Sequence, residues 1–332
     1  MTKRAYFLPM HHVVLIVYPG FELLDASGPA SVFNSANRAL CQQGRAPFYA
    51  VDLVSAGGGP VDSSSGIAVD TTAISALAPG CAQTVLIAGA EREHLLPAMA
   101  DPVLGAALPG LVAGARRFGS VCSGGFILAA LGLLDGRRVA THWDSCEPLA
   151  RRFPGITVDP DALYVVDGRL WTSAGVTTGI DMALAMIARD LDAAIAGAVA
   201  KRLILYARRP GYQSQFSPIL TAQVQADSPF ADLIGWIQSN LDEPLDVPSL
   251  AGRAGLSERT FHRKFVAATG ETPARFVETA RLTAARLLLS RGLSLKLVAG
   301  RVGLFPTARL SEAFARRFGI TPALFREMHT EL

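Results

Sequence analysis

A single cysteine stands where this chain could display a reactive thiol. In GSVCSGGFILAALGLLDG, residues 119–136, a short apolar run leads into Cys122, small residues follow, and a helical pattern then begins. At the start of a helix, free backbone N–H groups and the helix dipole lower the pKa of a thiol. We therefore expect Cys122 to have a lowered pKa and the placement of a nucleophile. A small, buried and inert cysteine is the alternative that the residues leave open.

The other cysteines, Cys41, Cys81 and Cys146, show no CxxC spacing and are expected to be structural. Four scattered cysteines in a chain of 332 residues are typical of a reducing compartment, so a cytoplasmic protein is expected. Neither a metal site nor a cofactor is predicted. Because no apolar run approaches 18 residues, we expect no membrane-spanning segment and no membrane partner.

The elements that must position Cys122 alternate between two patterns over the first 190 residues. Strand-like runs cover residues 13–18, 48–61 and 84–90, and helical patterns cover residues 29–40, 104–117 and 178–191. Strands that alternate with helices build a mostly parallel sheet, which defines the α/β class. Residues 10–192 are predicted to form this domain. Residues 193–229 begin with a helical pattern and continue with Pro, Gly, Gln and Ser, which predicts a helical linker.

The C-terminal third, residues 230–330, predicts an all-helical domain with an internal repeat. Residues 245–276 and 293–325 each predict a short helix, a turn with a glycine, a longer helix, and a Thr-Pro that opens another helix. This order is typical of a helix-turn-helix, here at about 247–268 and 295–318. One copy alone could be an ordinary helical hairpin. Two copies favour DNA binding, since residues 230–332 have a net charge of +4 against −1 for residues 1–229.

The longer helix of each repeat carries the side chains expected to contact DNA. Ser257 and Thr307 are predicted to cap these helices, while Phe261 and Phe265, four residues apart, are predicted to face inward. The candidate DNA-binding residues are Ser257, Arg259, Thr260, His262, Arg263, Lys264, Thr307, Arg309, Ser311, Glu312 and Arg316. They mix types that read bases with types that hold phosphates. Since both helices belong to one chain, it could enter two major-groove segments about one helical turn apart without dimerising.

Particular motifs in both parts resemble known families. The stretches AGLSERTFHRKFVAATGETPARF and AFARRFGITPALFR resemble the AraC-type DNA-binding domain. The stretches VYPGFELLDASGPASVF, SVCSGG and GLLDGRRVATHW resemble the ThiJ/PfpI class of the glutamine-amidotransferase-like fold. The combination resembles GlxA-type transcriptional regulators over nearly the whole chain. It implies a flavodoxin-like, doubly wound and mostly parallel sheet, followed by an all-α domain with two helix-turn-helix units.

The same resemblance implies roles for the residues around the cysteine. The candidate effector-pocket residues are Asp25, Gly89, Cys122, Ser123, His142 and Trp143. Cys122 matches the nucleophile-elbow position, Asp25 a neighbouring carboxylate, and Gly89 a loop that offers backbone N–H groups. The elbow reads Cys-Ser-Gly-Gly where these regulators have Cys-Thr-Gly-Ala, and the loop reads Gly-Ala where the enzymes have Gly-Gly. The second departure weakens the case for an oxyanion hole.

Two of these assignments have plain structural alternatives. Asp25 could cap a helix that begins near Pro29, and His142 could be a structural histidine. No Cys–His–acid spacing in the chain points strongly to a catalytic triad.

The sequence therefore predicts a transcriptional regulator that is not an enzyme. Its partners would be double-stranded promoter DNA and a small effector. The resemblance implies a nitrogen-containing metabolite such as an amino acid or a quaternary amine, and the fold class suggests a homodimer. One alternative is an active cysteine-dependent hydrolase or hydratase fused to a DNA-binding module, which requires a low thiol pKa. The other is a redox sensor in which oxidation of Cys122 changes the affinity for DNA.

Overall fold

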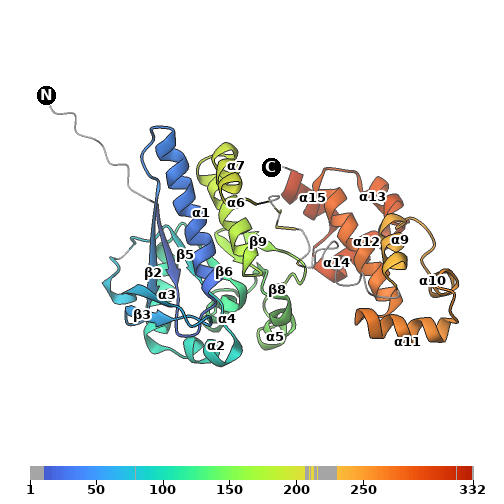
Figure 1. The fold of residues 1–332 in the computed structure, drawn as a ribbon, viewed down its shortest axis with the longest axis horizontal. Helices are drawn as coiled ribbons and strands as arrows, with labels where there is room; N and C mark the ends of the chain where they lie inside the picture. The colour runs from blue at the N-terminus through green and yellow to red at the C-terminus, as the bar shows by residue number, and fades with distance from the viewer. Residues whose placement is uncertain are drawn as a thin grey trace. The chain divides into compact units, whose positions relative to one another are not determined.

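The computed structural model describes residues 11–78, 80–205, 209, 211, 212, 215, 230–318 and 320–330. The chain divides into two units, Met1–Gly211 and Tyr212–Leu332. Figure 1 traces the elements of each unit in chain order.

A mostly parallel sheet forms the centre of the first unit. Its strands are β1 (His11–Ile16), β2 (Tyr49–Ser55), β3 (Gly59–Asp62), β4 (Ala68–Ala73), β5 (Thr84–Ile87), β6 (Arg117–Val121), β9 (Tyr164–Asp167) and β10 (Leu170–Ser173). They lie in the order β3-β4-β2-β1-β5-β6-β10-β9, parallel except where β3 and β9 pair antiparallel at the edges. β7 (Arg138–Val139) and β8 (Thr157–Val158) form a separate parallel pair. The predicted α/β class is confirmed.

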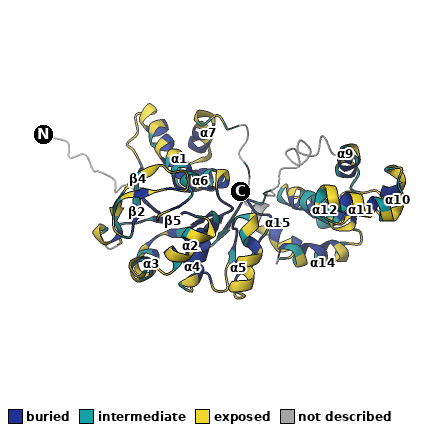
Figure 2. Ribbon diagram, turned by 60° about the horizontal axis from the view of Figure 1, so that its bottom comes forward, coloured by how far each residue is buried: buried dark blue, intermediate teal, exposed yellow. Residues whose placement is uncertain are grey.

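Helices cover both faces of this sheet because successive side chains of β1 point to opposite faces. Val13 and Leu15 pack on one face, and Val14 and Ile16 pack on the other. The helices on the first face are α1 (Leu23–Gln42), α6 (Thr177–Asp190) and α7 (Ala193–Arg202). Those on the second are α2 (Arg92–Met99), α3 (Pro102–Gly114), α4 (Gly125–Ala130) and α5 (Cys146–Arg152). Short 3-10 turns lie at η1 (Ile74–Ala76), η2 (Cys122–Gly124) and η3 (Trp143–Ser145). Figure 2 shows buried residues on the inward side of these helices and exposed residues on the outward side.

Among the described residues, no single helix is both long and apolar enough to cross a bilayer. Taken together, α2 and α3 reach that length and composition, but only as a pair bent by 74°.

Helix α1 begins earlier than its sequence pattern predicts. It starts at Leu23, with Glu22 as the N-cap that accepts from the Leu24 amide, so Pro29 lies inside the helix and not near its start. Gly28 and Pro29 are poor residues for a helix interior, which hid the first turn and a half from the sequence pattern. The buried face of the helix, which includes Phe33, stabilises it against the sheet.

Helix α7 belongs to the packed part of the first unit, although it falls in the predicted linker. Ile195, Ala196 and Val199 are buried against α1 and α6. Of the predicted linker, residues 206–208, 210, 213, 214 and 216–229 lie outside the described part of the chain.

A buried polar cluster joins α6 to the amino ends of the central strands. The Arg117 side chain donates to Thr84 Oγ1 over 2.8 Å and pairs with Asp190, the last residue of α6. Asp190 also accepts from the Tyr49 hydroxyl over 2.9 Å. Burial and the charge of Arg117 lower the pKa of His11 to about 4, so this ring stays neutral beside Thr84. The cluster lies at the opposite end of the sheet from Cys122 and is structural.

The described part of the second unit is helical. Its helices are α9 (Ala231–Ser239), α10 (Val247–Arg253), α11 (Glu258–Thr269), α12 (Pro273–Ser290), α13 (Leu295–Arg301), α14 (Thr307–Phe318) and α15 (Pro322–Thr330). α10 with α11 and α13 with α14 form the two helix-turn-helix units. Both turns need glycine, because Gly255 and Gly303 have φ values of 65° and 64°. The predicted repeat is confirmed.

Candidate functional site

The sheet brings four loops together at the carboxyl ends of its parallel strands. β1 leads to Asp25, β5 to Gly89, β6 to Cys122, and β10 to Val176. Ligand sites in open α/β sheets form at this edge. The sequence predicted three of these residues as one site, and the structure places those three beside the fourth, Val176.

Cys122 occupies a strained turn between β6 and α4. Its φ is +56°, a left-handed conformation that non-glycine residues seldom adopt. Ser123 supports the turn, because its hydroxyl donates to the Ala90 carbonyl over 2.7 Å and accepts from the Ala90 amide over 2.9 Å. The Thr141 hydroxyl donates to the Cys122 carbonyl over 2.9 Å. The predicted strand–turn–helix at Cys122 is confirmed.

Asp25 is buried beside the thiol and joins two of the loops. One carboxylate oxygen accepts from the Gly89 amide over 2.9 Å, and the other accepts from the Val176 amide over 2.7 Å. The Cys122 thiol also hydrogen-bonds to this carboxyl group. Since Glu22 caps α1, the alternative of Asp25 as the helix cap is wrong.

The thiol pKa lies in the opposite direction from the sequence prediction. Burial raises the pKa of Cys122 above its usual value, and the negative charge of Asp25 raises it further. Backbone and side-chain hydrogen bonds from Ser123 favour the thiolate but do not reverse this. The prediction of a lowered pKa is therefore wrong, because the thiol is largely surrounded by protein and faces a carboxylate.

The two amides that could have formed an oxyanion hole are already used within the protein. The Gly89 amide binds Asp25, and the Ala90 amide binds Ser123. Glycine is required at 89, because a Cβ there would lie 2.7 Å from Cys122 Cβ. An oxyanion hole needs donors aimed at the substrate oxygen, so this arrangement holds the elbow together and does not offer those donors to a substrate.

Asp25 gives the first unit a pH-dependent stability of defined sign. Burial raises its pKa to about 6, against the amide bonds that lower it, whereas an unfolded Asp titrates near 3.9. The folded state binds more protons between these values, so its stability must fall as the pH rises from about 4 to about 6 and then stay level.

Denaturation of the wild type and of Asp25→Asn across pH 4–7 measures this effect. The unfolding free energy of the wild type relative to the variant should fall by on the order of 2 kcal/mol. Taking the difference removes the contribution of His11, which has the opposite sign because its pKa is lowered. A difference independent of pH would contradict the assignment.

The loop after β10, residues 174–176, lies against the thiol and was missed by the sequence analysis. A Cβ on Gly175, whose φ is +94°, would come within 2.7 Å of Cys122 Sγ. Val176 follows with a φ of +51°, which is strained for a β-branched residue. The glycine in TSAGVTTG, residues 172–179, was the available signal, but only the fold reveals what it approaches.

His142 and Trp143 follow β7 near the same turn, since the preceding Thr141 binds Cys122. The His142 ring is half-buried and lies 5.3 Å from the Trp143 ring, centroid to centroid. Trp143 is 53% exposed, so its ring is available to solvent at the surface of this region.

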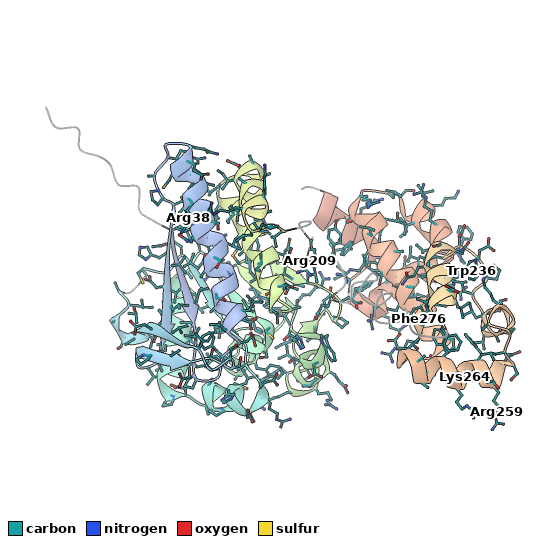
Figure 3. The ribbon with its side chains drawn as sticks, viewed as in Figure 1. Arg38, Arg209, Trp236, Arg259, Lys264 and Phe276 are labelled. Atoms are coloured by element: carbon teal, nitrogen blue, oxygen red, sulfur yellow. The ribbon has the colours of Figure 1, made fainter. Side chains whose placement is uncertain are left out.

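The chain leaves the first unit through an anchored residue, Arg209, which Figure 3 labels. Its guanidinium donates to Asp181 over 2.6 Å and 2.9 Å and to Thr177 over 2.8 Å, both on α6. Gly211 then accepts from the Leu163 amide over 2.8 Å. Since Val176 directly precedes α6, the first turns of α6 link the loop that is bound to Asp25 with the exit of the chain.

The side of α11 that was predicted to face DNA is exposed to solvent. Ser257 caps the helix by accepting from the Thr260 amide, and Phe261 and Phe265 are buried. The polar residues exposed on this helix and its cap are Ser257, Glu258, Arg259, His262, Arg263 and Lys264, with Thr260 half-buried. Figure 3 shows Arg259 and Lys264 projecting outward from α11.

The second helix, α14, differs from its prediction in two ways. Thr307 is its first residue and not its cap. Arg316 forms an ion pair with Glu278 of α12. Arg309 and Glu312 are exposed and Ser311 is half-buried, so the amino-terminal half of α14 presents the polar surface.

These two parts define a class of protein: an α/β domain with a cysteine elbow, joined to a tandem helix-turn-helix domain. Two family models match in the same places. The first, DJ-1/PfpI family, covers residues 11–189, and the second, helix-turn-helix domain, covers residues 250–328. The chain belongs to the DJ-1/PfpI family, in the group whose members carry an AraC-type helix-turn-helix domain and act as transcriptional regulators.

Individual relatives match the whole of this architecture or a part of it. The chain is 30% identical over 294 residues to "HTH-type transcriptional regulator GlxA" of Rhizobium meliloti, covering 84% of this chain and 86% of the relative. It is 31% identical over 200 residues to "Isonitrile hydratase" of Pseudomonas putida, covering 60% and 80%. The crystal structure of a ThiJ/PfpI family protein from Pseudomonas syringae matches with a TM-score of 0.53 at 26% identity, covering 68% of this chain and 89% of that one.

Proposed function

We propose that this DNA-binding transcriptional regulator senses a small nitrogen-containing metabolite at the carboxyl edge of its sheet. The observation that carries the proposal is the closed state of the Cys122 elbow. Its thiol has a raised pKa, and the nearby amides are bound to Asp25 and Ser123. Such a site is suited to binding and poorly suited to turnover. Asp25, Gly89, Cys122, Ser123, His142 and Trp143 would form the effector pocket.

The charge of this edge supports a cationic effector. Asp25 and Glu22 lie close enough for the charge of Glu22 to raise the pKa of Asp25. A positively charged nitrogen would stabilise both carboxylates, and an exposed tryptophan such as Trp143 can bind a cation through its ring face. Amino acids and quaternary amines carry such a nitrogen.

We also propose how the signal reaches the DNA-binding domain. An effector that displaces the Val176 amide from Asp25 would shift the first turn of α6, where Arg209 is anchored. An effector regulates only if it binds two states with different affinity. The closed loop over Cys122 is one state, and a form with that loop displaced would be the other. The first unit would also form the homodimer, with residues 230–330 as the DNA-binding domain.

Capture of genomic fragments by the purified protein, at stated salt, tests the regulator. Enrichment of a few promoters is expected, and the neighbouring genes would indicate the effector. Candidate amines and amino acids are then added to the complex with the enriched promoter. If no candidate shifts that affinity, while Cys122→Ala still binds the promoter, the sensing part of the proposal fails.

A cysteine-dependent hydratase is the second candidate, favoured by the strained elbow φ at Cys122 and by the relative named isonitrile hydratase. It requires turnover that is lost in both Cys122→Ala and Asp25→Ala. A redox sensor is a weaker candidate, because a thiol with a raised pKa forms little thiolate. DNA affinity that changes with peroxide, and no longer does so in Cys122→Ala, would favour it.

Replacing Arg259 or Arg309 with alanine should weaken binding to the captured promoter. Both side chains are exposed near the start of the second helix of their unit, and an arginine that reads a base contributes about 1–3 kcal/mol. Arg151→Ala, on exposed α5 of the first unit, is the charge-matched control and should leave the affinity unchanged. Fluorescence anisotropy on the promoter and on an unrelated duplex separates base reading from phosphate contact. Equal losses on both duplexes would show phosphate contact instead.

A further inference from the structure

The two helix-turn-helix units have separate hydrophobic cores. The first core gathers buried residues of α9, α10 and α11, and the second gathers those of α13, α14 and α15. Helix α12 contributes to both, with Val277 in the first core and Leu282 and Leu289 in the second. Packing within each core fixes that unit but does not by itself fix one unit against the other. Their relative placement depends on α12 and on the polar contacts beside it.

Arg281, in the middle of α12, donates two hydrogen bonds to the first helix-turn-helix unit, within the second unit of the chain. Its Nε donates to the Leu241 carbonyl over 3.0 Å, and its Nη2 donates to the Glu243 carbonyl over 2.8 Å. These carbonyls belong to the loop between α9 and α10. A planar guanidinium that binds two acceptors fixes their direction as well as their distance.

The second helix-turn-helix unit also contacts the loop between α9 and α10. A Cβ on Gly303, in the turn between α13 and α14, would lie 2.5 Å from the Leu241 carbonyl oxygen and 2.8 Å from Arg281 Nη2. Three groups therefore meet at one point: Gly303 of the second helix-turn-helix unit, the Leu241 carbonyl of the first, and the Arg281 guanidinium. No larger residue at 303 permits this approach.

We propose that Arg281 is a positioning residue that sets the separation of the two helix-turn-helix units for successive major grooves. The inference rests on the proposed use of both units on one DNA segment. Its geometry is the arginine fork on the loop at 241–243, with the Gly303 turn packed against that loop.

The surroundings of Arg281 explain why its hydrogen bonds to the loop at 241–243 matter. A pocket of about 1050 Å³ lies between the two helix-turn-helix units. It is lined by the 242–246 loop and by residues of α12 and α14. Burial lowers the pKa of Arg281, and the charge of Arg309 lowers it further. The two carbonyl acceptors hold Arg281 near a second cation that it would otherwise repel. Arg309, which is a candidate for contacting a base, thus lies beside Arg281, and Arg281 would set the distance of Arg309 from the first helix-turn-helix unit.

The test compares full-length Arg281→Lys with the wild type on two versions of the captured promoter. One is native, and the other has one base pair inserted between the two contacted segments, which displaces one groove by about 3.4 Å. The wild type should bind the altered duplex at least tenfold more weakly than the native one. Arg281→Lys keeps the charge but not the fork, so it should bind the native duplex about tenfold more weakly and distinguish the two by less than threefold.

Arg291→Ala, exposed at the end of α12, is the control and should keep the wild-type preference. Thermal unfolding confirms that each variant is folded, and Arg281→Gln replaces the lysine variant if that one unfolds. A variant that loses affinity equally on both duplexes, with the wild-type preference intact, overturns the proposal. A wild type that binds neither duplex specifically overturns the two-unit binding mode itself, so the two failures are distinguishable.

Discussion

Phe265→Ala is expected to lower the unfolding free energy of the second unit by about 3–5 kcal/mol and to abolish specific DNA binding. The Phe265 side chain is fully buried, with ring centroids 5.3–5.4 Å from Phe230, Phe261 and Phe276. The cavity left by the ring would lie under α11. Since domains are stable by only about 5–15 kcal/mol, a loss of this size removes most of the margin.

Urea unfolding of the isolated variant, followed by circular dichroism, measures the change. Leu287→Ala is the matched control, because Leu287 lies on α12 with 42% of its surface exposed. It should change the stability by less than about 0.5 kcal/mol. A Phe265→Ala protein as stable as the control would mean that the first core can close around the missing ring.

Gly175→Ala is expected to open the loop over the Cys122 thiol. The new Cβ would lie 2.3 Å from Cys122 Cβ, and the residue would also keep a φ of +94°. Either the loop or the elbow must move, at a cost of about 1–3 kcal/mol. With the loop displaced, the thiol loses part of the burial that raises its pKa, so alkylation of Cys122 should become about tenfold faster.

Iodoacetamide labelling, with each cysteine followed by mass spectrometry, separates Cys122 from the exposed Cys41. Gly168→Ala is the control: its φ is +60°, but a Cβ there meets no atom within 4 Å. It carries similar backbone strain without the contact and should leave the labelling of Cys122 unchanged. Equal acceleration in both variants would attribute the effect to general loosening.

The sequence was sufficient for the elements and for the order of the domains. The apolar run of the first strand, the repeated glycine turns and the inward phenylalanines are all local patterns, which the chain displays directly. Asp25, Gly89 and Cys122 could be grouped because each follows a different strand of one parallel sheet.

The properties that depend on distant neighbours could not be predicted. The thiol pKa was wrong because Asp25 and the loop at 174–176 bury Cys122, and no local pattern reports that burial. The start of α1 was wrong because packing overrides Gly28 and Pro29. Arg281 resembled any other helix arginine until the loop carbonyls and Gly303 were seen around it.

The sharing of α12 between two cores constrains the length of this helix. Each residue of an α-helix turns the chain by about 100°, so one inserted residue between Val277 and Leu282 would rotate one unit against the other by that angle. Substitutions on the exposed side of this helix are tolerable, but insertions and deletions change how α11 and α14 are oriented toward their major grooves. In related regulators, the amino acids on the exposed side of this helix should therefore vary, while the number of residues in the helix stays constant wherever the spacing of the two DNA segments is the same.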